Sequence, residues 1–546
     1  MPFRHLLVLP LVVATSLALD GLLWTALAPG HWTVAKTMML SSFALATPWV
    51  GFCVANGLIG FVILLVRGRT TPPWDGAPAM PAQAMPRTAL AVTVRNEDIG
   101  SVLPPLRDLL DGIDRAGLGE RFTVCVLSDT NDPALAEAEE RAVAAFGDRM
   151  RYRRRTSNEG YKAGNVMEFL DHHADGFEVM VTLDADSRMS ARAVLRLVTT
   201  LAREPGLAIV QHLTVGLPAR SPFPRLFQFG MRAGMRSWAT ALAWWQGDQS
   251  CYWGHNAAIR IAPFRAHARL PILPGGRHIL SHDQVEAAML AGAGWGVRLL
   301  PEEDGSAEAN PPAFPEFIRR DMRWLAGNLE YVHLLRMPGL RPMGRWQLIQ
   351  AIALFGCAPL YLILLLAAAW AAVADRDAGY AACWLGLTAI AWVIAMYSPK
   401  LLCYLELLLS RAKAARYGGR AKVLTGAAVE MTLALIVDPI AVWYKSETVA
   451  RLLAGRPATW APQNRADRGV TWREATGLLW KQTVLGVVVF AAFASAGPLT
   501  VAMALPLAGG LLVAIPFCVL SADPRLGAWL QRRAIAAIPE ELDPKG

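Results

Sequence analysis

The chain has 546 residues, of which 54% are hydrophobic and only 18% are charged, and its mean hydropathy is +0.31. A typical soluble domain carries about 25% charged residues, so this composition excludes a disordered chain and argues against a purely soluble enzyme. The net charge of +9 is compatible with nucleic-acid binding, but in a membrane protein Lys and Arg gather in the cytoplasmic loops. We therefore expect a membrane protein that binds no nucleic acid.

Apolar stretches long enough to cross a bilayer lie toward both ends of the chain, because about 20 apolar residues span the hydrocarbon core. The predicted spans are Leu6–Ala28, Met38–Val66, Leu348–Ala374, Tyr380–Tyr397, Thr483–Ala496 and Leu499–Leu520. A further apolar stretch, Val423–Tyr444, contains Glu430, Asp438 and Pro439 and has basic loops on both sides. One full crossing would separate these loops, so we interpret it as re-entrant or interfacial, with two short crossings as the alternative.

Lys and Arg in the short loops predict the orientation of the chain. They place the polar region 67–345, the two basic loops and both termini in the cytoplasm. The predicted organisation is two transmembrane helices in residues 1–66, a cytoplasmic domain in 67–345, and transmembrane and interfacial helices in 346–546 with a cytoplasmic loop at 456–472.

The polar region alternates apolar, β-branched runs with helical patterns. Strands are predicted at Ala89–Arg95, Phe122–Ser128, Met150–Arg154, Glu178–Leu183 and Ala208–Leu213. Helices such as Ala134–Phe146 and Ala191–Arg203 lie between them. This alternation predicts an α/β domain with a largely parallel sheet, in which ligands bind beyond the carboxyl ends of the strands.

Acidic side chains follow three of these predicted strands. Glu97 follows the first strand, Asp129 follows the second, and Asp184 and Asp186 follow the fourth. Any one of them alone is better explained as a helix N-cap, since Asp is a preferred capping residue. Two carboxylates two positions apart repel each other unless a cation lies between them, and Mg²⁺ or Mn²⁺ accepts such oxygens together with substrate phosphates. The pair therefore favours a metal-assisted nucleotide site.

Basic residues lie near the same predicted edge. Lys162 sits in a Gly-containing loop, Ser157–Asn165, that leads into a helix and can approach a phosphate. The run Arg151–Arg155 is interpreted as a solvated strand edge. Neither GxGxxG nor GxxxxGK[ST] occurs there, so dinucleotide binding and P-loop chemistry lose support.

Two further motifs come later in the polar region. Asp283 opens a predicted helix and is either its cap or a general base. On the helical stretch Phe314–Leu335, the side chains of Arg320, Arg323 and Trp324 share one face because they lie three and four positions apart. That face suits a phosphate and a sugar ring, but it is equally typical of a juxtamembrane helix.

The ordered set Asp129, Asp184-x-Asp186, His282-Asp283 and Arg320-x-x-Arg323-Trp324 resembles the D, DxD, (T/E)D, (Q/R)xxRW series of processive family 2 glycosyltransferases, which include cellulose and hyaluronan synthases. Further segments resemble the bacterial glucans biosynthesis glucosyltransferase H family. They are Tyr252–Asn256, Ile279–Asp283, Ala291–Val297 and Arg320–Leu329.

This resemblance implies a GT-A fold and an inverting transfer of glucose from UDP-glucose, with Mg²⁺ or Mn²⁺. The implied product is the β-1,2-linked backbone of osmoregulated periplasmic glucans, which the same chain would move across the bacterial inner membrane. Acyl carrier protein and a periplasmic glucan-processing protein are implied as associated partners.

The resemblance also implies a role for each matching residue. Asp283 would be the general base. The nucleotide-binding residues would be Glu97, Asp129, Lys162, Asp184, Asp186, Arg320 and Arg323, with Asp186 the direct metal ligand and Asp184 beside it. Trp324 would stack under the acceptor glucose, with His255, Asn256 and His282 as further acceptor contacts. A gating loop over the nucleotide would contain Trp460, Gln463 and Arg465.

Two alternatives remain open. One keeps the fold and changes the product to a cellulose-, chitin- or hyaluronan-like polymer. The other is a transporter or sensor with a degenerate glycosyltransferase domain, which the intramembrane acids Asp20, Glu430 and Asp438 favour because such groups often mark transport pathways.

Overall fold

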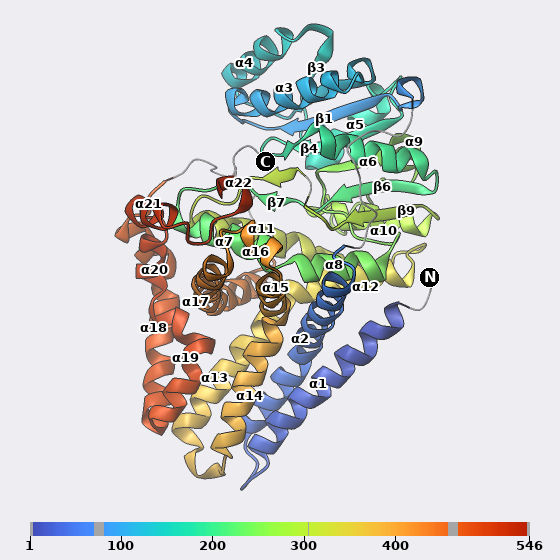
Figure 1. Ribbon diagram of the computed structural model, residues 1–546. Coiled ribbons are helices and arrows are strands. Elements are labelled where there is room, and N and C mark those ends of the chain that lie inside the picture. The colour runs from blue at the N-terminus through green and yellow to red at the C-terminus, as the bar shows by residue number, and fades with distance from the viewer. Residues whose placement is uncertain (1–3, 70–80, 304, 457–467, 543–546) are drawn as a thin grey trace.

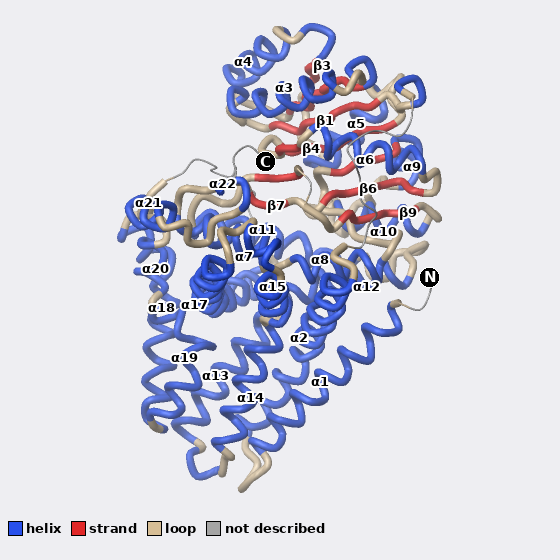
Figure 2. Tube along the Cα trace, in the orientation of Figure 1, coloured by secondary structure: helices blue, strands red, loops and turns tan. Residues whose placement is uncertain are grey.

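A computed structural model describes residues 4–69, 81–303, 305–456 and 468–542. Both sheets lie in an α/β part at one end of the molecule, and the rest is helical (Figure 2). Long helices run away from the α/β part toward the opposite end (Figure 1). The arrangement confirms the predicted α/β domain inserted between helical segments.

The central sheet has seven strands in the order β3-β2-β1-β4-β8-β6-β9. Their bounds are β1 Thr88–Val94, β2 Phe122–Ser128, β3 Met150–Arg154, β4 Val179–Asp184, β6 Leu207–His212, β8 Ala257–Arg260 and β9 Gly296–Leu300. The prediction gives β2 and β3 their observed bounds and shifts β1, β4 and β6 by one residue. It misses β8 and β9. β8 pairs antiparallel with β4 and β6, so the sheet is mixed.

Helices cover both faces of this sheet, as buried parallel strands require. On β1, Leu90 and Val92 join a core with α3 (Ile99–Arg115) and α6 (Ala191–Arg203). The alternate residues Ala89 and Ala91 face the other side. The helices on that side are α5 Tyr161–His172, α9 Ile261–His267 and α10 Asp283–Gly292.

A second, three-stranded sheet lies beside the first. It is built from β5 (Arg188–Met189), β10 (Ser306–Glu308) and β7 (Val215–Gly216), with β10 in the middle. β10 leads toward α11 (Phe314–Leu329), which carries the Arg-Trp motif. The small sheet therefore places α11 near the ends of the large sheet.

Five helices among the described residues are long and apolar enough to cross a membrane, or up to seven if each bent helix pair counts as one span. By length and composition the five are α1 His5–Leu27, α2 Val34–Val66, α12 Pro342–Gly356 continued by α13 Ala358–Ala374, α17 Arg420–Leu453 and α18 Trp472–Ala496. The bent pairs are α14 Ala382–Met396 with α15 Ser398–Leu409, and α19 Pro498–Leu512 with α20 Ala514–Leu520. The chain is a multi-pass membrane protein, as predicted.

The ambiguous stretch Val423–Tyr444 lies inside one continuous helix, α17 (Arg420–Leu453). A continuous helix excludes a re-entrant hairpin and two short crossings, so those two expectations are wrong. α17 is seen nearly end-on in Figure 1, whereas α13, α14, α18 and α19 run down the picture. This crosswise position suits an interfacial helix, which stays our prediction.

The α/β part is joined closely to the N-terminal helices. α8 (Arg236–Gln246) packs on α2, where a Cβ at Gly60 would come within 1.9 Å of the Ser237 carbonyl oxygen. Only glycine permits this approach. Trp245 of α8 also donates its indole N–H to Asn56 of α2 at 3.1 Å. The sheet is thereby fixed in position relative to the membrane helices.

The C-terminal region returns to the α/β part. α7 (Pro222–Ala233) carries Arg225, which is fully buried, and Arg232, which is nearly so. Arg225 pairs with Glu541, and Arg232 pairs with Glu540 and, at 2.8 Å, with Glu303. Charges this deeply buried are stable only with partners, so the C-terminal glutamates complete the packing of α7.

Candidate active site

The acidic residues predicted at the strand ends do meet at one edge of the sheet. Asp184 is the last residue of β4 and lies opposite Thr93 of β1. Asp129 directly follows β2, and its backbone N–H donates to the Val94 carbonyl oxygen at 2.9 Å. Glu97 lies in the loop after β1. The parallel register of β1, β2 and β4 is what brings these side chains together.

Asp129 is held by a basic residue that the sequence interpretation missed. Arg155, just after β3, forms a two-pronged ion pair with its carboxylate, including an Nη2–Oδ2 contact of 2.8 Å. The side chains are only 10% and 5% exposed. Arg155 also donates to the carbonyl oxygens of Glu159 and Tyr161. The expected solvated edge is therefore wrong for Arg155, because it folds inward onto Asp129, while Arg151 and Arg154 are exposed.

Lys162 lies in the first turn of α5 and bridges two parts of the site. Its ammonium group pairs with the carboxylate of Asp184 and donates to the Gly254 carbonyl oxygen at 2.9 Å. Asp186 lies two residues further, in the turn after β4. The DxD motif thus has one carboxylate already paired with a lysine, so Asp184 and Asp186 are not equivalent.

The donor set fits a hard divalent cation only together with a substrate. Among the described residues, no group of three or more His, Cys, Asp or Glu side chains is placed to hold a metal. Asp186, with Asp184 beside it, offers carboxylate oxygens, which Mg²⁺ and Mn²⁺ prefer. Phosphate oxygens of a nucleotide would complete such a coordination shell.

Asp283, the candidate base, is the first residue of α10 and is partly exposed. Burial raises the pKa of its carboxyl above the usual value, and the nearby charge of Glu286 adds to this, while His282 opposes it. His282 contacts Glu286 through Nδ1 at 2.9 Å. Burial alone would lower the pKa of His282, but Glu286 and Asp283 together raise it. A carboxylate with a raised pKa is a better proton acceptor than an ordinary aspartate.

α11 carries the predicted motif Arg320-x-x-Arg323-Trp324. Arg320 is buried, and its guanidinium lies 4.5 Å from the ring centroid of Trp324, which is 46% exposed. Burial lowers the pKa of Arg320, and the charges of Glu308 and Asp321 act against it, followed by that of Asp186. Arg323 is partly exposed one turn along the same face. The predicted grouping is therefore present, but only Arg323 and Trp324 reach the surface, because Arg320 is buried.

The predicted acceptor residues His255 and Asn256 precede β8. His255 lies 3.3 Å from Glu308 of β10. Asn256 is fully buried and donates its side-chain amide to Ser306 at 3.0 Å. Glu308 thus faces both His255 and Arg320. No motif in the sequence points to Glu308, because its role depends on the pairing of β10 with β7.

The predicted gating residues Trp460, Gln463 and Arg465 lie outside the described residues. The segment that follows them is anchored to the site. Arg468 donates to Glu316 in the first turn of α11 and to Glu474 in α18, at 2.7 and 2.6 Å. Glu316 is only 2% exposed, so this contact ties the end of the loop to the helix that carries Arg320.

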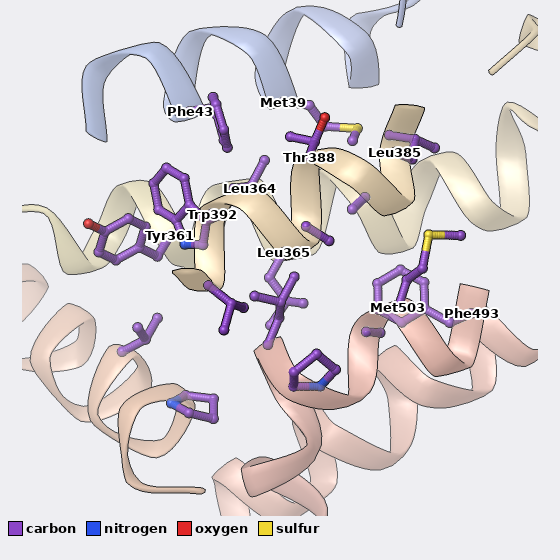
Figure 3. A pocket seen from close by; sticks show the side chains of 18 of the residues that line it. Met39, Phe43, Tyr361, Leu364, Leu365, Leu385, Thr388, Trp392, Phe493 and Met503 are labelled. Carbon is purple, nitrogen blue, oxygen red and sulfur yellow. The ribbon is translucent and has the colours of Figure 1, made fainter. Parts of the chain in front are cut away.

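Two cavities continue from the site into the helical part. The smaller one, of about 380 Å³, is lined by Trp253 and Gln284, the chain neighbours of Gly254 and Asp283. The larger one, of about 870 Å³, lies among α2, α13, α14, α17, α18 and α19. Figure 3 shows its mostly apolar and aromatic walls, which include Phe43, Tyr361 and Trp392.

Comparison with known proteins agrees with this fold and site. The model for glycosyl transferase family 2 matches residues 90–267, and that for glycosyl transferase family group 2 matches residues 179–404. The mixed sheet, the acidic edge and the Arg-Trp helix thus belong to a family 2 glycosyltransferase with a GT-A domain. Such an enzyme uses a nucleotide-sugar donor and an acceptor.

The curated relatives narrow this class. The glucans biosynthesis glucosyltransferase H of Caulobacter vibrioides strain NA1000 / CB15N is 33% identical over 538 residues, covering 94% of this chain and 80% of that protein. The protein of the same name from Xylella fastidiosa strain 9a5c is 33% identical over 558 residues, covering 97% and 87%. The chain belongs to the glucans biosynthesis glucosyltransferase H family, which confirms the resemblance noted in the sequence.

A more distant likeness appears among solved structures. The mannosyltransferase PcManGT from Pyrobaculum calidifontis, in complex with GDP-Man and Mn²⁺, is 17% identical with a TM-score of 0.46. The match covers 69% of this chain and 99% of that one.

Proposed function

We propose that this chain polymerises glucose from UDP-glucose into the β-1,2-linked backbone of osmoregulated periplasmic glucans and moves the product across the bacterial inner membrane. The observation that carries the proposal is the group of carboxylates at one edge of the sheet, where Asp129 follows β2, Asp184 ends β4 and the charge of Asp186 acts on the buried Arg320. Gln284, next to Asp283, lines a cavity that reaches the helical part. The family membership supports glucose as the transferred sugar.

In this proposal the nucleotide occupies the acidic edge. Asp129, Glu97 and Lys162 hold the uridine end, and Arg155 keeps the Asp129 carboxylate in place. Asp184 and Asp186 hold the diphosphate through Mg²⁺ or Mn²⁺. A bound divalent cation would neutralise charge on the departing UDP. Arg320 and Arg323 stabilise the same diphosphate electrostatically as the bond to glucose breaks.

The transfer is a single displacement. Asp283 takes the proton from an acceptor hydroxyl while that oxygen bonds to the anomeric carbon. The bond between that carbon and the β-phosphate oxygen breaks, and UDP leaves with the electron pair. Attack from the face opposite the leaving group converts an α-linked donor into a β-linked product. Trp324, with its exposed ring, packs against the acceptor glucose, and His255, His282 and Asn256 help to shape that side.

The proposed organisation places the GT-A domain, residues 67–345, and both termini in the cytoplasm, with membrane segments in 1–66 and 346–546. The loop at 456–472, most of which lies outside the described residues, is the proposed gating loop. The chain contacts the growing glucan and the lipid bilayer, and acyl carrier protein and a periplasmic glucan-processing protein are its proposed protein partners.

The first experiment uses the full chain in proteoliposomes with labelled UDP-glucose and Mg²⁺, and Asp283→Asn as control, followed by linkage analysis of any polymer. A β-1,2-linked polymer that is absent from the control is the expected result. A β-1,4-linked polymer, or incorporation only from another UDP-sugar, would replace the product with that of another processive synthase. UDP binding without any polymer would favour the transporter or sensor alternative.

A further inference from the structure

The two cavities meet at a small set of residues. Both are lined by Trp49, Leu354, Met396, Tyr397 and Asp438. The smaller cavity begins beside Asp283, and the larger one extends to Arg376 and Ala496 at the far end of the helical part. A polymer that leaves the active site through these cavities has to pass the shared residues.

Asp438 of α17 is an unusual residue at this junction. It is exposed although its neighbours Val437 and Pro439 are buried, because it lines the two cavities. Its carboxylate accepts a hydrogen bond from the hydroxyl of Tyr397. An ionised carboxylate among apolar helices is costly, and such residues often mark functional pathways.

Tyr397 occupies a position that can move. It lies at the break between α14 and α15, where the chain bends by 67°. Its hydroxyl joins that bend to α17 through Asp438. Lys400 and Tyr404 of α15 also contact Glu430 of α17, so opening the Tyr397 hydrogen bond would free both polar groups for another partner while α15 and α17 stay joined.

The surroundings match the needs of a sugar. Trp49 is half-buried and supplies an aromatic wall in both cavities. Aromatic side chains offer an apolar face that suits the C–H face of a sugar ring. An ionised carboxylate accepts hydrogen bonds, which sugar hydroxyls can donate. Within the described chain, the buried Oη of Tyr361 and Oε1 of Gln350, on the larger and smaller cavity respectively, have no hydrogen-bond partner.

The junction is also connected to the catalytic helix. Lys445 lies two helical turns from Asp438, lines the larger cavity, and pairs with Asp321 of α11 at 3.2 Å. Tyr444 donates to the same carboxylate at 2.6 Å. Asp321 directly follows Arg320. A displacement of α17 at the junction is therefore transmitted by direct contacts to the helix that carries Arg320 and Trp324.

We propose that Asp438, Tyr397 and Trp49 form a glucan-binding subsite at the junction of the two cavities. A glucose unit packs on Trp49 and donates a hydroxyl to Asp438, which replaces the hydrogen bond from Tyr397. This inference rests on the proposed translocation and adds to it the residues that the polymer must engage.

The test uses proteoliposomes with the GT-A domain outside, UDP-glucose and Mg²⁺. Two quantities are measured: polymer length, and the fraction of polymer protected from an added β-1,2-glucanase. Asp438→Leu is expected to reduce both by about tenfold or more, the loss that follows from about 1.4 kcal/mol of binding. Tyr397→Phe, which removes one hydroxyl, is expected to have a smaller effect in the same direction. UDP binding reports whether each variant is folded.

Glu447→Gln provides the matched control. Glu447 is also on α17, but it pairs with Lys481 at 2.7 Å, both side chains being well exposed, and it lines neither cavity. It should leave both quantities unchanged.

Polymer length and protection at the wild-type values in both Asp438→Leu and Tyr397→Phe would overturn the proposed subsite. If a phospholipid also co-purifies with the protein in that case, the cavity holds lipid and not glucan. Unprotected wild-type polymer would instead refute translocation itself, and that result is seen before any variant is made.

Discussion

The carboxylates in the two halves of the proposed active site lie in different electrostatic surroundings. On the nucleotide side, Asp129 and Asp184 are each paired with a basic residue, Arg155 and Lys162. On the proposed acceptor side, burial raises the pKa of the Asp283 carboxyl, although His282 and Lys162 oppose it. A carboxylate held in a close ion pair is suited to holding a ligand in place, whereas one with a raised pKa is suited to taking a proton.

The largest effect is expected from the acceptor side. Asp283→Asn should reduce the rate of transfer by about 10²- to 10⁴-fold, the usual contribution of a general base, because an amide cannot take the proton. UDP affinity, measured by calorimetry, should stay near the wild-type value. A variant that retains the full rate would remove Asp283 from the mechanism.

The next effect concerns the nucleotide side. Arg155→Met leaves Asp129 charged and unpaired while 5% exposed, and removing one partner of a buried pair costs about 3–5 kcal/mol. We expect a large fall in the thermal midpoint of the purified protein and weaker UDP binding. The double variant Arg155→Met/Asp129→Leu should recover much of the midpoint but not the UDP binding. If the single variant were as stable as wild type, the pairing would have no structural role.

A pH profile distinguishes the two kinds of carboxylate without mutation. The pKa of Asp283 is raised above the usual 3.8, and only its deprotonated form acts as a base. The pH at which kcat/KM begins to fall on the acid side should therefore be higher than for an ordinary aspartate. Below that pH, kcat/KM should fall about tenfold per pH unit. An acid limb at or below pH 3.8 would contradict the burial of the base.

The smallest effect is expected at Lys162. Lys162→Met removes the ammonium group that pairs with Asp184, so Asp184 becomes available to a divalent cation. The Mn²⁺ concentration for half-maximal UDP binding should fall several-fold, while maximal UDP binding decreases because a residue proposed to hold the uridine end is lost. An unchanged Mn²⁺ dependence would mean that Asp184 plays no part in metal binding.

The sequence predicts the local parts of this site well. Asp129 directly follows β2 and Asp184 ends β4, both strands with strong β-branched patterns, and the parallel register then brings them together. The face shared by Arg320 and Trp324 follows from helical spacing alone. These features depend on neighbouring residues, which is why sequence patterns capture them.

The features that sequence analysis misses depend on distant contacts. Arg155 looks like part of a solvated basic run until the fold places it against Asp129, 26 residues away. β8 has only four residues and gains its place by antiparallel pairing with β4 and β6. The polar residues of α17 look like interruptions of a span. In the structure, Asp438 contacts Tyr397 at the α14–α15 bend, and Lys445 pairs with Asp321 on α11.

The glutamates that pair with α7 have a consequence for the order of synthesis. Glu541 and Glu540 follow Arg225 and Arg232 by 316 and 308 residues, so the ribosome makes every membrane helix described here before these partners emerge. Until then Arg225 lacks its acidic partner and Arg232 has only Glu303, which disfavours the final packing of α7. A chain whose last residues have not yet been made therefore lacks part of the packing that fixes α7, so we expect the α/β part to reach its final form only after the membrane helices have been made.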